Sequence, residues 1–277
     1  MKKPAYLFSV LSLLFLNISI YAWKGGIMQS ITDENLDKSR TDSLKITILY
    51  DNYVFNQDTK SDWGFSCLIE SSDKTILFDT GTKGELLLNN IDALNIDLAK
   101  VDLLVLSHIH SDHTGGIPSV ISRNSDLIAY VPVSFPKDFG EKNRIRELKR
   151  VDEAVEICKG VYSTGEMGDF IKEQSLIINT KKGLVIITGC AHQGILSILS
   201  KTKEIFNKKI YLVIGGFHLL QKSDTEMKDI IIEFKRLGVK KCGATHCTGE
   251  KQIQMFKEAF GENYVEMGTG RILKITE

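Results

Sequence analysis

Hydrophobic residues gather into short β-branched runs and longer stretches of helical spacing from residue 44 onward. The runs at 44–52, 63–70 and 74–81 are separated by turn residues, which predicts a meander of adjacent strands. The leucines of KGELLLNNIDAL (83–94) have helical spacing, whereas VDLLVLSH (101–108) is apolar throughout, like a strand buried on both faces. This half of the region therefore predicts a group of strands with a helix among them.

The second half repeats this order of elements without repeating the sequence. A hairpin is predicted from 175 to 192, turning at Lys181, Lys182 and Gly183. After it, helices are expected at 194–206, 225–238 and 251–260, and strands at 209–218, 239–247 and 270–277. Two successive sets of strands with intervening helices predict a layered α/β sandwich, with sheets inside and helices outside.

The segment from Ser125 to Gln174 fits this pattern least. It contains YVPVSFPKDFG and a charged stretch, EKNRIRELKRVDEAVEI. Long irregular segments in compact domains are often functional, so one interpretation is a lid-like insert, around 125–174, that covers the substrate. A plain surface excursion fits the same pattern, and the sequence leaves the two open.

The composition is that of an ordinary globular protein. Of the 277 residues, 43% are hydrophobic and 25% are charged. Because 35 basic residues balance 35 acidic residues, the charge indicates no nucleic-acid partner, and a small-molecule substrate is the remaining expectation. The sequence leaves the oligomeric state open.

The N-terminus predicts export. Lys2 and Lys3 precede an uncharged, largely apolar run that ends near Ala22, which is the pattern of a signal peptide over residues 1–22. The run 4–23 is also long enough for an uncleaved membrane anchor, and this alternative stays open. Both interpretations place the rest of the chain outside the cytoplasm, in the periplasm or beyond the cell.

Residues 23–43 separate this leader from the rest of the chain. They are polar and lack an apolar period, which predicts a tether. One domain is then expected from 44 to 277. Five cysteines are few for a disulfide-rich exported domain, so a hydrophobic core has to supply most of the stability, with room for one disulfide.

All six histidines lie just past the end of a predicted strand and close to a glycine. In SHIHSDHTGG (107–116), His108 and His110 are two residues apart, so in an extended segment they point the same way and can chelate one ion. Asp112 and His113 follow where the chain turns, and they can face a second ion beside the first. This turn therefore predicts the start of a two-metal centre.

The later histidines complete the two ligand sets. His192 in TGCAH and His246 in THCTG are the expected donors, since a catalytic metal needs about three protein ligands and an open position for water. Imidazole and carboxylate ligands suit two divalent ions, zinc (Zn2+) first, with iron or manganese as alternatives. Cys190 and Cys247 are expected to be small buried residues rather than ligands, because neighbours of a ligand in an extended segment point away from the metal.

These motifs resemble those of the metallo-β-lactamase superfamily. HIHSDH matches its HxHxDH signature, and FDTG, the later histidines and the order of elements match its αββα sandwich, over roughly residues 44–277. TGCAHQGI, GGFHL and THCTG are similar to one branch, named after the dihydropterin ribofuranosylaminobenzene phosphate synthase of methanopterin biosynthesis. The resemblance implies a four-layer αββα fold and a metal-dependent enzyme.

The resemblance also assigns roles to residues. It implies one ligand set of His108, His110 and His192 and a second of Asp112, His113 and His246. It implies that Asp79 in FDTG supports the metal-bearing loops through hydrogen bonds. Glycine stands at the end of IGG, where the superfamily usually has an aspartate that bridges both metals. His218 lies just beyond and is expected at the substrate rather than on a metal, so Asp112 and His218 are the catalytic candidates.

Three functions are compatible with these assignments. Two adjacent divalent ions would provide hydroxide near neutral pH, so the leading hypothesis is a metal-dependent hydrolase of a small ester, phosphoester or cyclic amide. The branch resemblance supports a transferase, in which an arylamine displaces a phosphate or pyrophosphate group. The third candidate is a di-iron redox protein or a non-catalytic binding protein of the same fold.

Overall fold

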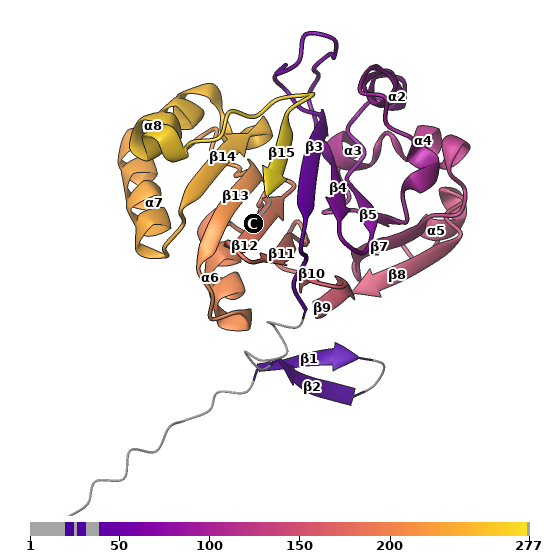
Figure 1. Ribbon diagram of the computed structural model, residues 1–277, viewed down its shortest axis with the longest axis horizontal. Helices are drawn as coiled ribbons and strands as arrows, with labels where there is room; N and C mark the ends of the chain where they lie inside the picture. The colour runs from indigo at the N-terminus through magenta and orange to yellow at the C-terminus, as the bar shows by residue number, and fades with distance from the viewer. Residues whose placement is uncertain (1–19, 25–26, 32–38, 276–277) are drawn as a thin grey trace, which may run out of the picture.

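Two β-sheets lie face to face at the centre of the molecule, with helices on both outer sides (Figure 1). The computed structural model describes residues 20–24, 27–31 and 39–275. The expected α/β architecture, a four-layer αββα sandwich, is confirmed.

The first sheet has seven strands in the order β15-β3-β4-β5-β6-β7-β8. Its strands are β3 (Leu44–Tyr50), β4 (Ser66–Ser71), β5 (Thr75–Phe78), β6 (Leu103–Val105), β7 (Ile128–Pro132), β8 (Glu147–Val151) and β15 (Ile272–Ile275). Strands β15, β3, β4 and β5 pair antiparallel, whereas β5 to β8 run parallel. Because β5 and β6 are parallel, the segments that follow them leave the sheet at the same edge.

The second sheet has six strands in the order β14-β13-β12-β11-β10-β9. Its strands are β9 (Glu153–Cys158), β10 (Val161–Gly165), β11 (Leu176–Thr180), β12 (Gly183–Thr188), β13 (Ile210–Gly216) and β14 (Lys241–Thr245). Strands β12, β13 and β14 are parallel. Three further strand ends therefore open at one edge of this sheet.

Helices cover the outer face of each sheet (Figure 1). The first sheet carries α2 (Gly84–Ala93), α3 (Ser111–Thr114), α4 (Ile117–Arg123) and α5 (Phe139–Lys142), and the second carries α6 (Ile195–Ile205), α7 (Asp224–Arg236) and α8 (Glu250–Phe260). Short 3-10 turns follow at η1 (Leu98–Lys100), η2 (His246–Thr248) and η3 (Gly261–Asn263). One buried core lies between the sheets and includes Ile46 and Ile187, and separate cores lie under the two helical layers.

The helix α7 shows how the sequence specifies these elements. Ser223 accepts a hydrogen bond from the backbone of Glu226, and the Glu226 side chain accepts one from the backbone of Ser223, so a capping box starts the helix. Met227, Ile231 and Phe234 follow at helical spacing and are buried against the second sheet. The helix therefore begins and packs where the sequence pattern predicts.

The segment 125–174 is more regular than either interpretation of its sequence, a lid or a surface excursion, suggested. It contributes the strands β7 and β8 to the first sheet, with the helix α5 between them, and the strands β9 and β10 to the second sheet. The segment therefore forms an edge of each sheet and the connection between the two sheets. In β8, only Val151 is fully buried, because this edge strand carries charged side chains on its open face. Because of these charges, the sequence lacks the alternation of apolar and polar residues that marks a strand. The segment therefore looked irregular in the sequence, although it forms regular strands.

The N-terminal expectations are only partly within the described residues. Most of the leader, residues 1–19, lies outside them. The strand β1 (Ile20–Lys24) spans the end of the expected leader and the start of the expected tether, and it pairs with β2 (Ile27–Ile31) as an antiparallel hairpin that the sequence pattern did not predict. The backbone N–H of Thr41 donates to the carbonyl of Asn179 at 3.1 Å, so the domain begins slightly before residue 44. Among the residues described, no helix is long and apolar enough to cross a membrane.

Candidate metal centre

All six histidines gather at the edge where the parallel strands of both sheets end. Their rings form a chain of neighbours, with centroids 4.2 to 5.1 Å apart from each ring to the next. His108, His110 and His113 follow β6, whereas His192, His218 and His246 follow β12, β13 and β14. Each sheet therefore supplies half of the histidines.

Three of these histidines point their ring nitrogens at one another. The Nε2 atom of His108 lies 3.0 Å from Nδ1 of His110 and 3.3 Å from Nε2 of His192. We call these residues the histidine triad. His108 is fully buried, and the other two are half-buried, so the triad is open to solvent on one side.

A buried carboxylate supports the loop that carries His192. Glu173 is completely buried, and its Oε1 accepts hydrogen bonds from the backbone of Cys190 and Ala191 at 2.8 and 2.9 Å. Its Oε2 accepts one from the backbone of His192 at 2.9 Å. Ala191 has a φ of 62°, an unfavourable backbone conformation for alanine that these three bonds help to hold.

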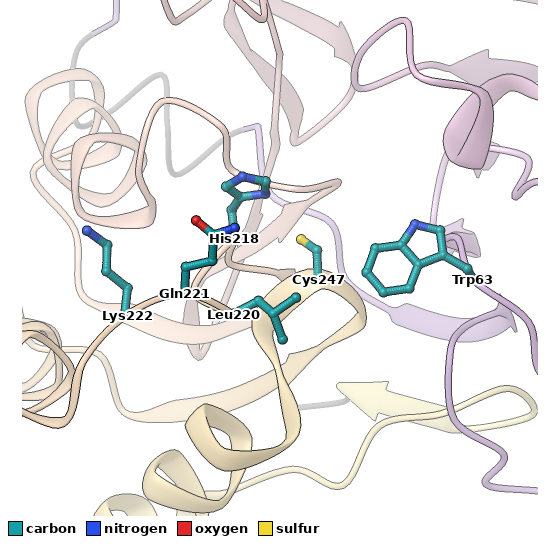
Figure 2. Close-up of a pocket in the computed structure, with 6 residues that line it drawn as sticks. All are labelled: Trp63, His218, Leu220, Gln221, Lys222 and Cys247. Atoms are coloured by element: carbon teal, nitrogen blue, oxygen red, sulfur yellow. The ribbon is translucent and has the colours of Figure 1, made fainter.

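A cavity of about 370 Å³ opens beside the triad (Figure 2). Its lining comes from the loop before β4 and from the segments after β13 and β14, and consists of Trp63, His218, Leu220, Gln221, Lys222 and Cys247. None of these residues lies in 125–174. The ring of His218 is 4.3 Å from that of His192, so this exposed histidine stands between the triad and the cavity.

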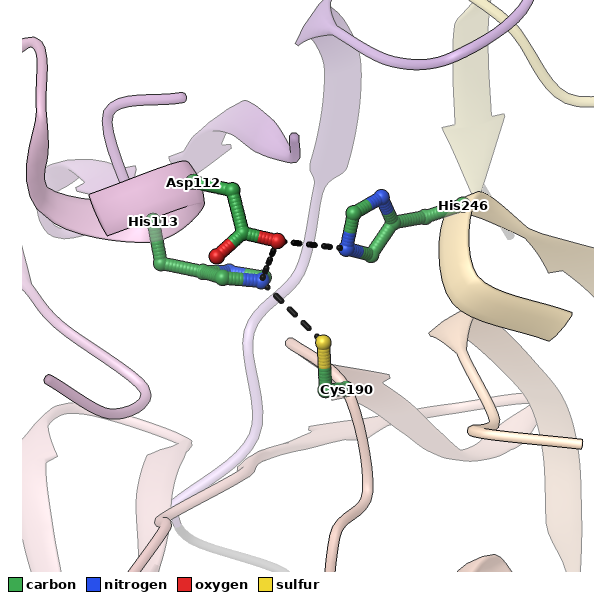
Figure 3. Close-up of side chains that lie close together, drawn as sticks. All are labelled: Asp112, His113, Cys190 and His246. Atoms are coloured by element: carbon green, nitrogen blue, oxygen red, sulfur yellow. Dashed lines mark hydrogen bonds and ion pairs between the residues drawn. The ribbon is translucent and has the colours of Figure 1, made fainter. Parts of the chain in front are cut away.

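A second set of donors lies next to the triad, since the ring of His113 is 4.2 Å from that of His108. Figure 3 draws this set. We call it the mixed group; its members are Asp112, His113, Cys190 and His246. Oδ2 of Asp112 lies 3.7 Å from Nε2 of His113 and 3.4 Å from Nε2 of His246. Sγ of Cys190 lies 3.2 Å from Nε2 of His113.

Other side chains fix the orientation of these donors. Oδ2 of Asp79 lies 2.7 Å from Nδ1 of His113, and Oδ1 of Asn52 lies 2.9 Å from Nδ1 of His246. In both cases Nδ1 is occupied, and Nε2 is left to face the group. The indole N–H of Trp63 donates to Oδ2 of Asp112 at 2.8 Å and holds that carboxylate in place.

The same network reaches the triad. The hydroxyl of Ser107 donates to Oδ2 of Asp79 at 2.7 Å, and its oxygen lies 2.9 Å from Nδ1 of His108. The expected support role of Asp79 therefore has a physical basis at both sets of donors.

Burial controls the protonation of these groups. It lowers the pKa of His113 to about 3 and that of His192 to about 4, so both imidazoles are neutral at physiological pH. It also raises the pKa of the Asp79 carboxyl to about 8 and the pKa of the Cys190 thiol well above its usual range. For Asp112, burial works in the same upward direction, but the interactions with His246 and His113 outweigh it and hold the pKa low.

These residues fit divalent metals. Neutral imidazole is the form of histidine that binds a metal, and an ionised aspartate accompanies it. Nε2 of His246 is buried and makes no hydrogen bond; it has an ion-pair contact of 3.4 Å with Oδ2 of Asp112, an arrangement that a metal between the two atoms would satisfy. The structure therefore contains two adjacent donor groups with the chemistry of metal sites.

The structure brings together every residue that the sequence marked for this site, and it adds four. Cys190 was expected to point away, but its sulfur lies among the donors of the mixed group. It stands two residues from His192, with Ala191 at a φ of 62° between them, so the rule for adjacent residues of an extended segment does not apply to it. Asn52, Trp63 and Glu173 carried no motif. Glu173 lies in the segment read as a lid, and no spacing in the sequence relates it to His192.

Comparisons with known proteins agree with the fold. The family pattern described as the metallo-beta-lactamase superfamily matches residues 64–200. The chain belongs to this superfamily.

Two relatives extend over most of the chain. It is 32% identical to the 7,8-dihydropterin-6-methyl-4-(beta-D-ribofuranosyl)-aminobenzene-5'-phosphate synthase of Methanocaldococcus jannaschii, with 85% of this chain and 98% of that protein covered. The crystal structure of Tm1679, described as a metal-dependent hydrolase of the beta-lactamase superfamily, is also 32% identical, with a TM-score of 0.73 and coverage of 84% of this chain and 100% of that one. An uncharacterized protein of M. jannaschii is 30% identical over 83% of this chain and 100% of its own length.

Proposed function

We propose that this protein is a metal-dependent hydrolase that acts on a small, phosphorylated or cyclic substrate outside the cytoplasm. The observation that carries the proposal is the histidine triad, whose three nitrogens converge beside a cavity of about 370 Å³ and of which two members, His110 and His192, are only half-buried. Three protein ligands with an open side are typical of a catalytic metal site.

A divalent metal at these nitrogens would supply a Lewis acid and an acidified water. The chain's own residues supply the rest. Glu173 fixes the loop of His192, and Ser107 holds the ring of His108, so the triad keeps its geometry while substrate enters.

The cavity supplies groups for substrate binding. His218 and Gln221 offer hydrogen-bond donors toward an anionic or carbonyl group, and Trp63 and Leu220 offer apolar contact area. His218 is therefore a candidate for binding the substrate and for moving a proton at its leaving group. No serine or cysteine nucleophile is required in this proposal.

The test is an assay of the purified protein on phosphodiester, lactone and β-lactam substrates before and after removal of metal with a chelator. We expect hydrolysis of at least one class, loss of activity in the stripped protein, and recovery with added zinc. The His110→Ala variant should bind one metal fewer and be inactive, while Asp58→Asn, at an exposed position far from the donors, should behave like the wild type. Full activity in a metal-free preparation would exclude the proposal.

A second candidate is a transferase. It is supported by the 32% identity to the M. jannaschii synthase over nearly the full length of that protein. In such a reaction the arylamine nitrogen forms a bond to the pterin methyl carbon, the pyrophosphate leaves with the electron pair of its C–O bond, and the amine loses a proton. Release of pyrophosphate that depends on the arylamine acceptor would favour the transferase, and release without the acceptor would favour hydrolysis.

A further inference from the structure

We propose that Cys190 is a metal ligand, that the mixed group is a closed site with four protein donors, and that the histidine triad is the open site where the reaction occurs. This inference rests on the metal chemistry of the proposed function. It goes beyond that function because it gives the two sites different tasks and assigns the thiol to one of them.

The spacing of the donors fits a tetrahedral site. Bonds of about 2.0 Å to nitrogen or oxygen and about 2.3 Å to sulfur give a tetrahedron with edges of about 3.3 to 3.5 Å. The observed separations from His113 Nε2 to Cys190 Sγ and from His246 Nε2 to Asp112 Oδ2 are 3.2 and 3.4 Å. The one from His113 Nε2 to Asp112 Oδ2, 3.7 Å, is close to this range. Small adjustments of the side chains would complete the polyhedron.

The two groups differ in burial as the two tasks require. His113, Cys190 and His246 are 0%, 3% and 1% exposed, and the fourth member, Asp112, is covered in part by the indole of Trp63. A buried site with four protein ligands has no position for substrate or water and is typical of a structural metal. The triad has three ligands, two of them half-buried, and the cavity lies beside it.

The chain has no room for the bridging aspartate that the superfamily usually has. A Cβ atom at Gly216 would lie 2.4 Å from the carbonyl of Gly189 and 2.7 Å from Sγ of Cys247. One at Gly215 would lie 2.1 Å from the carbonyl of Thr188. Cys190, which follows β12 rather than β13, can supply the missing negative charge instead.

This ligation has a simple proton balance. The thiol of Cys190 loses its proton to solvent when the Sγ–metal bond forms, because a coordinated thiol is deprotonated. The thiolate and the Asp112 carboxylate together then balance the two positive charges of the ion. No oxidant or reductant is needed.

A competing site shares the same sulfur. Cys190, His218 and Cys247 have donor atoms within 4.8 Å of one another, so a metal could bind there instead. The mixed group is favoured because Nε2 of His246 is buried, makes no hydrogen bond and faces the Asp112 carboxylate at 3.4 Å, whereas the Cys247 thiol is directed to the carbonyl of Cys190 at 3.6 Å. Cys190 cannot serve both positions at once, so the two assignments can be separated by experiment.

The test uses the full-length protein loaded with cobalt(II), whose bond to a thiolate gives a near-ultraviolet charge-transfer band. We expect the wild type to bind about two cobalt ions per chain and to show the band, and Cys190→Ser to bind about one and to lack it. Cys247→Ser should keep both the band and the stoichiometry. Cys158→Ser, a half-buried thiol on β9 far from the histidines, is the matched control.

The outcomes separate this inference from the proposed function. His110→Ala should lose the cobalt of the triad and retain the band. The assignment would be overturned if the band persists in Cys190→Ser. It would also be overturned if the band is lost in Cys247→Ser but retained in His246→Asn. A band with the expected behaviour in a protein that hydrolyses none of the substrates would leave the thiolate ligand standing and reject the hydrolase.

Discussion

Oδ2 of Asp79 lies 2.7 Å from Nδ1 of His113, and both side chains are completely buried. This contact fixes which nitrogen of His113 faces the mixed group. An amide in place of the carboxyl group replaces one of its oxygens with a hydrogen-bond donor, so we expect Asp79→Asn to weaken metal binding at the mixed group by about 10- to 100-fold. Titration with a competing chelator measures the change, and Asp58→Asn is the control. Unchanged affinity in Asp79→Asn would show that the contact does not orient the ligand.

Glu173 connects the segment between β10 and β11 to the loop of His192. In the wild type, both carboxylate oxygens of Glu173 accept hydrogen bonds from backbone N–H groups. In Glu173→Gln, the side-chain NH₂ would face one of these N–H groups, so at least one buried donor would lose its partner. We expect the free energy of unfolding to fall by about 1–3 kcal/mol and metal binding at the triad to weaken. Denaturant titration of the metal-free protein gives the first quantity. Glu153→Gln, at an exposed position on β9, should change neither.

Gly216 occupies the place of the usual bridging aspartate. Because a Cβ there meets the Gly189 carbonyl and the Cys247 sulfur, Gly216→Asp should destabilise the fold rather than restore a bridge, by about 1–3 kcal/mol or more. Gly238→Asp gives the comparison for backbone strain without overlap, since its φ is 79° and no atom lies within 4 Å of a Cβ there, and Gly216→Asp should lose more stability than this variant. Thermal unfolding compares the two variants, and a stable Gly216→Asp protein with tighter metal binding would contradict the packing argument.

Metal binding at the triad should resist mild acid. Burial lowers the pKa of His108 well below its ordinary value and that of His192 to about 4, so protons compete for these nitrogens only at lower pH. For an exposed histidine with a pKa near 6.5, only about one tenth of the side chains are neutral at pH 5.5. We expect zinc affinity at the triad to fall much less between pH 7 and 5.5 than that of the peptide SHIHSDHTGG, in which the rings are exposed. Equal losses in the protein and the peptide would refute this.

The sequence predicted the elements whose pattern is local. The hairpin of β11 and β12 turns at Lys181 and Lys182 as expected, and α7 begins at its capping box. The strands β7 to β10 were missed because edge positions carry charges, and charges such as those of β8 remove the alternation that marks a strand.

The residues of the candidate site also divide into those that the sequence could predict and those that it could not. The histidines could be found because each follows a strand, and the parallel strands of a sheet end at one edge. Glu173 and Asn52 could not be found, because they act through contacts between segments far apart in the chain. Cys190 is buried, as expected, but its sulfur lies 3.2 Å from Nε2 of His113. The rule for adjacent residues did not apply to it, because it stands two residues from His192 and Ala191 between them has a φ of 62°.

The histidines of the triad come from both halves of the sandwich. His108 and His110 follow a strand of the first sheet, and His192 follows a strand of the second. An ion held by all three is therefore a cross-link between the halves, and it would stabilise the native state by about 4 kcal/mol when present at 1,000 times its dissociation constant. Loss of the ion would then weaken the association of the two sheets as well as abolish the proposed activity. The metal supply would therefore determine both the activity and the lifetime of the folded protein.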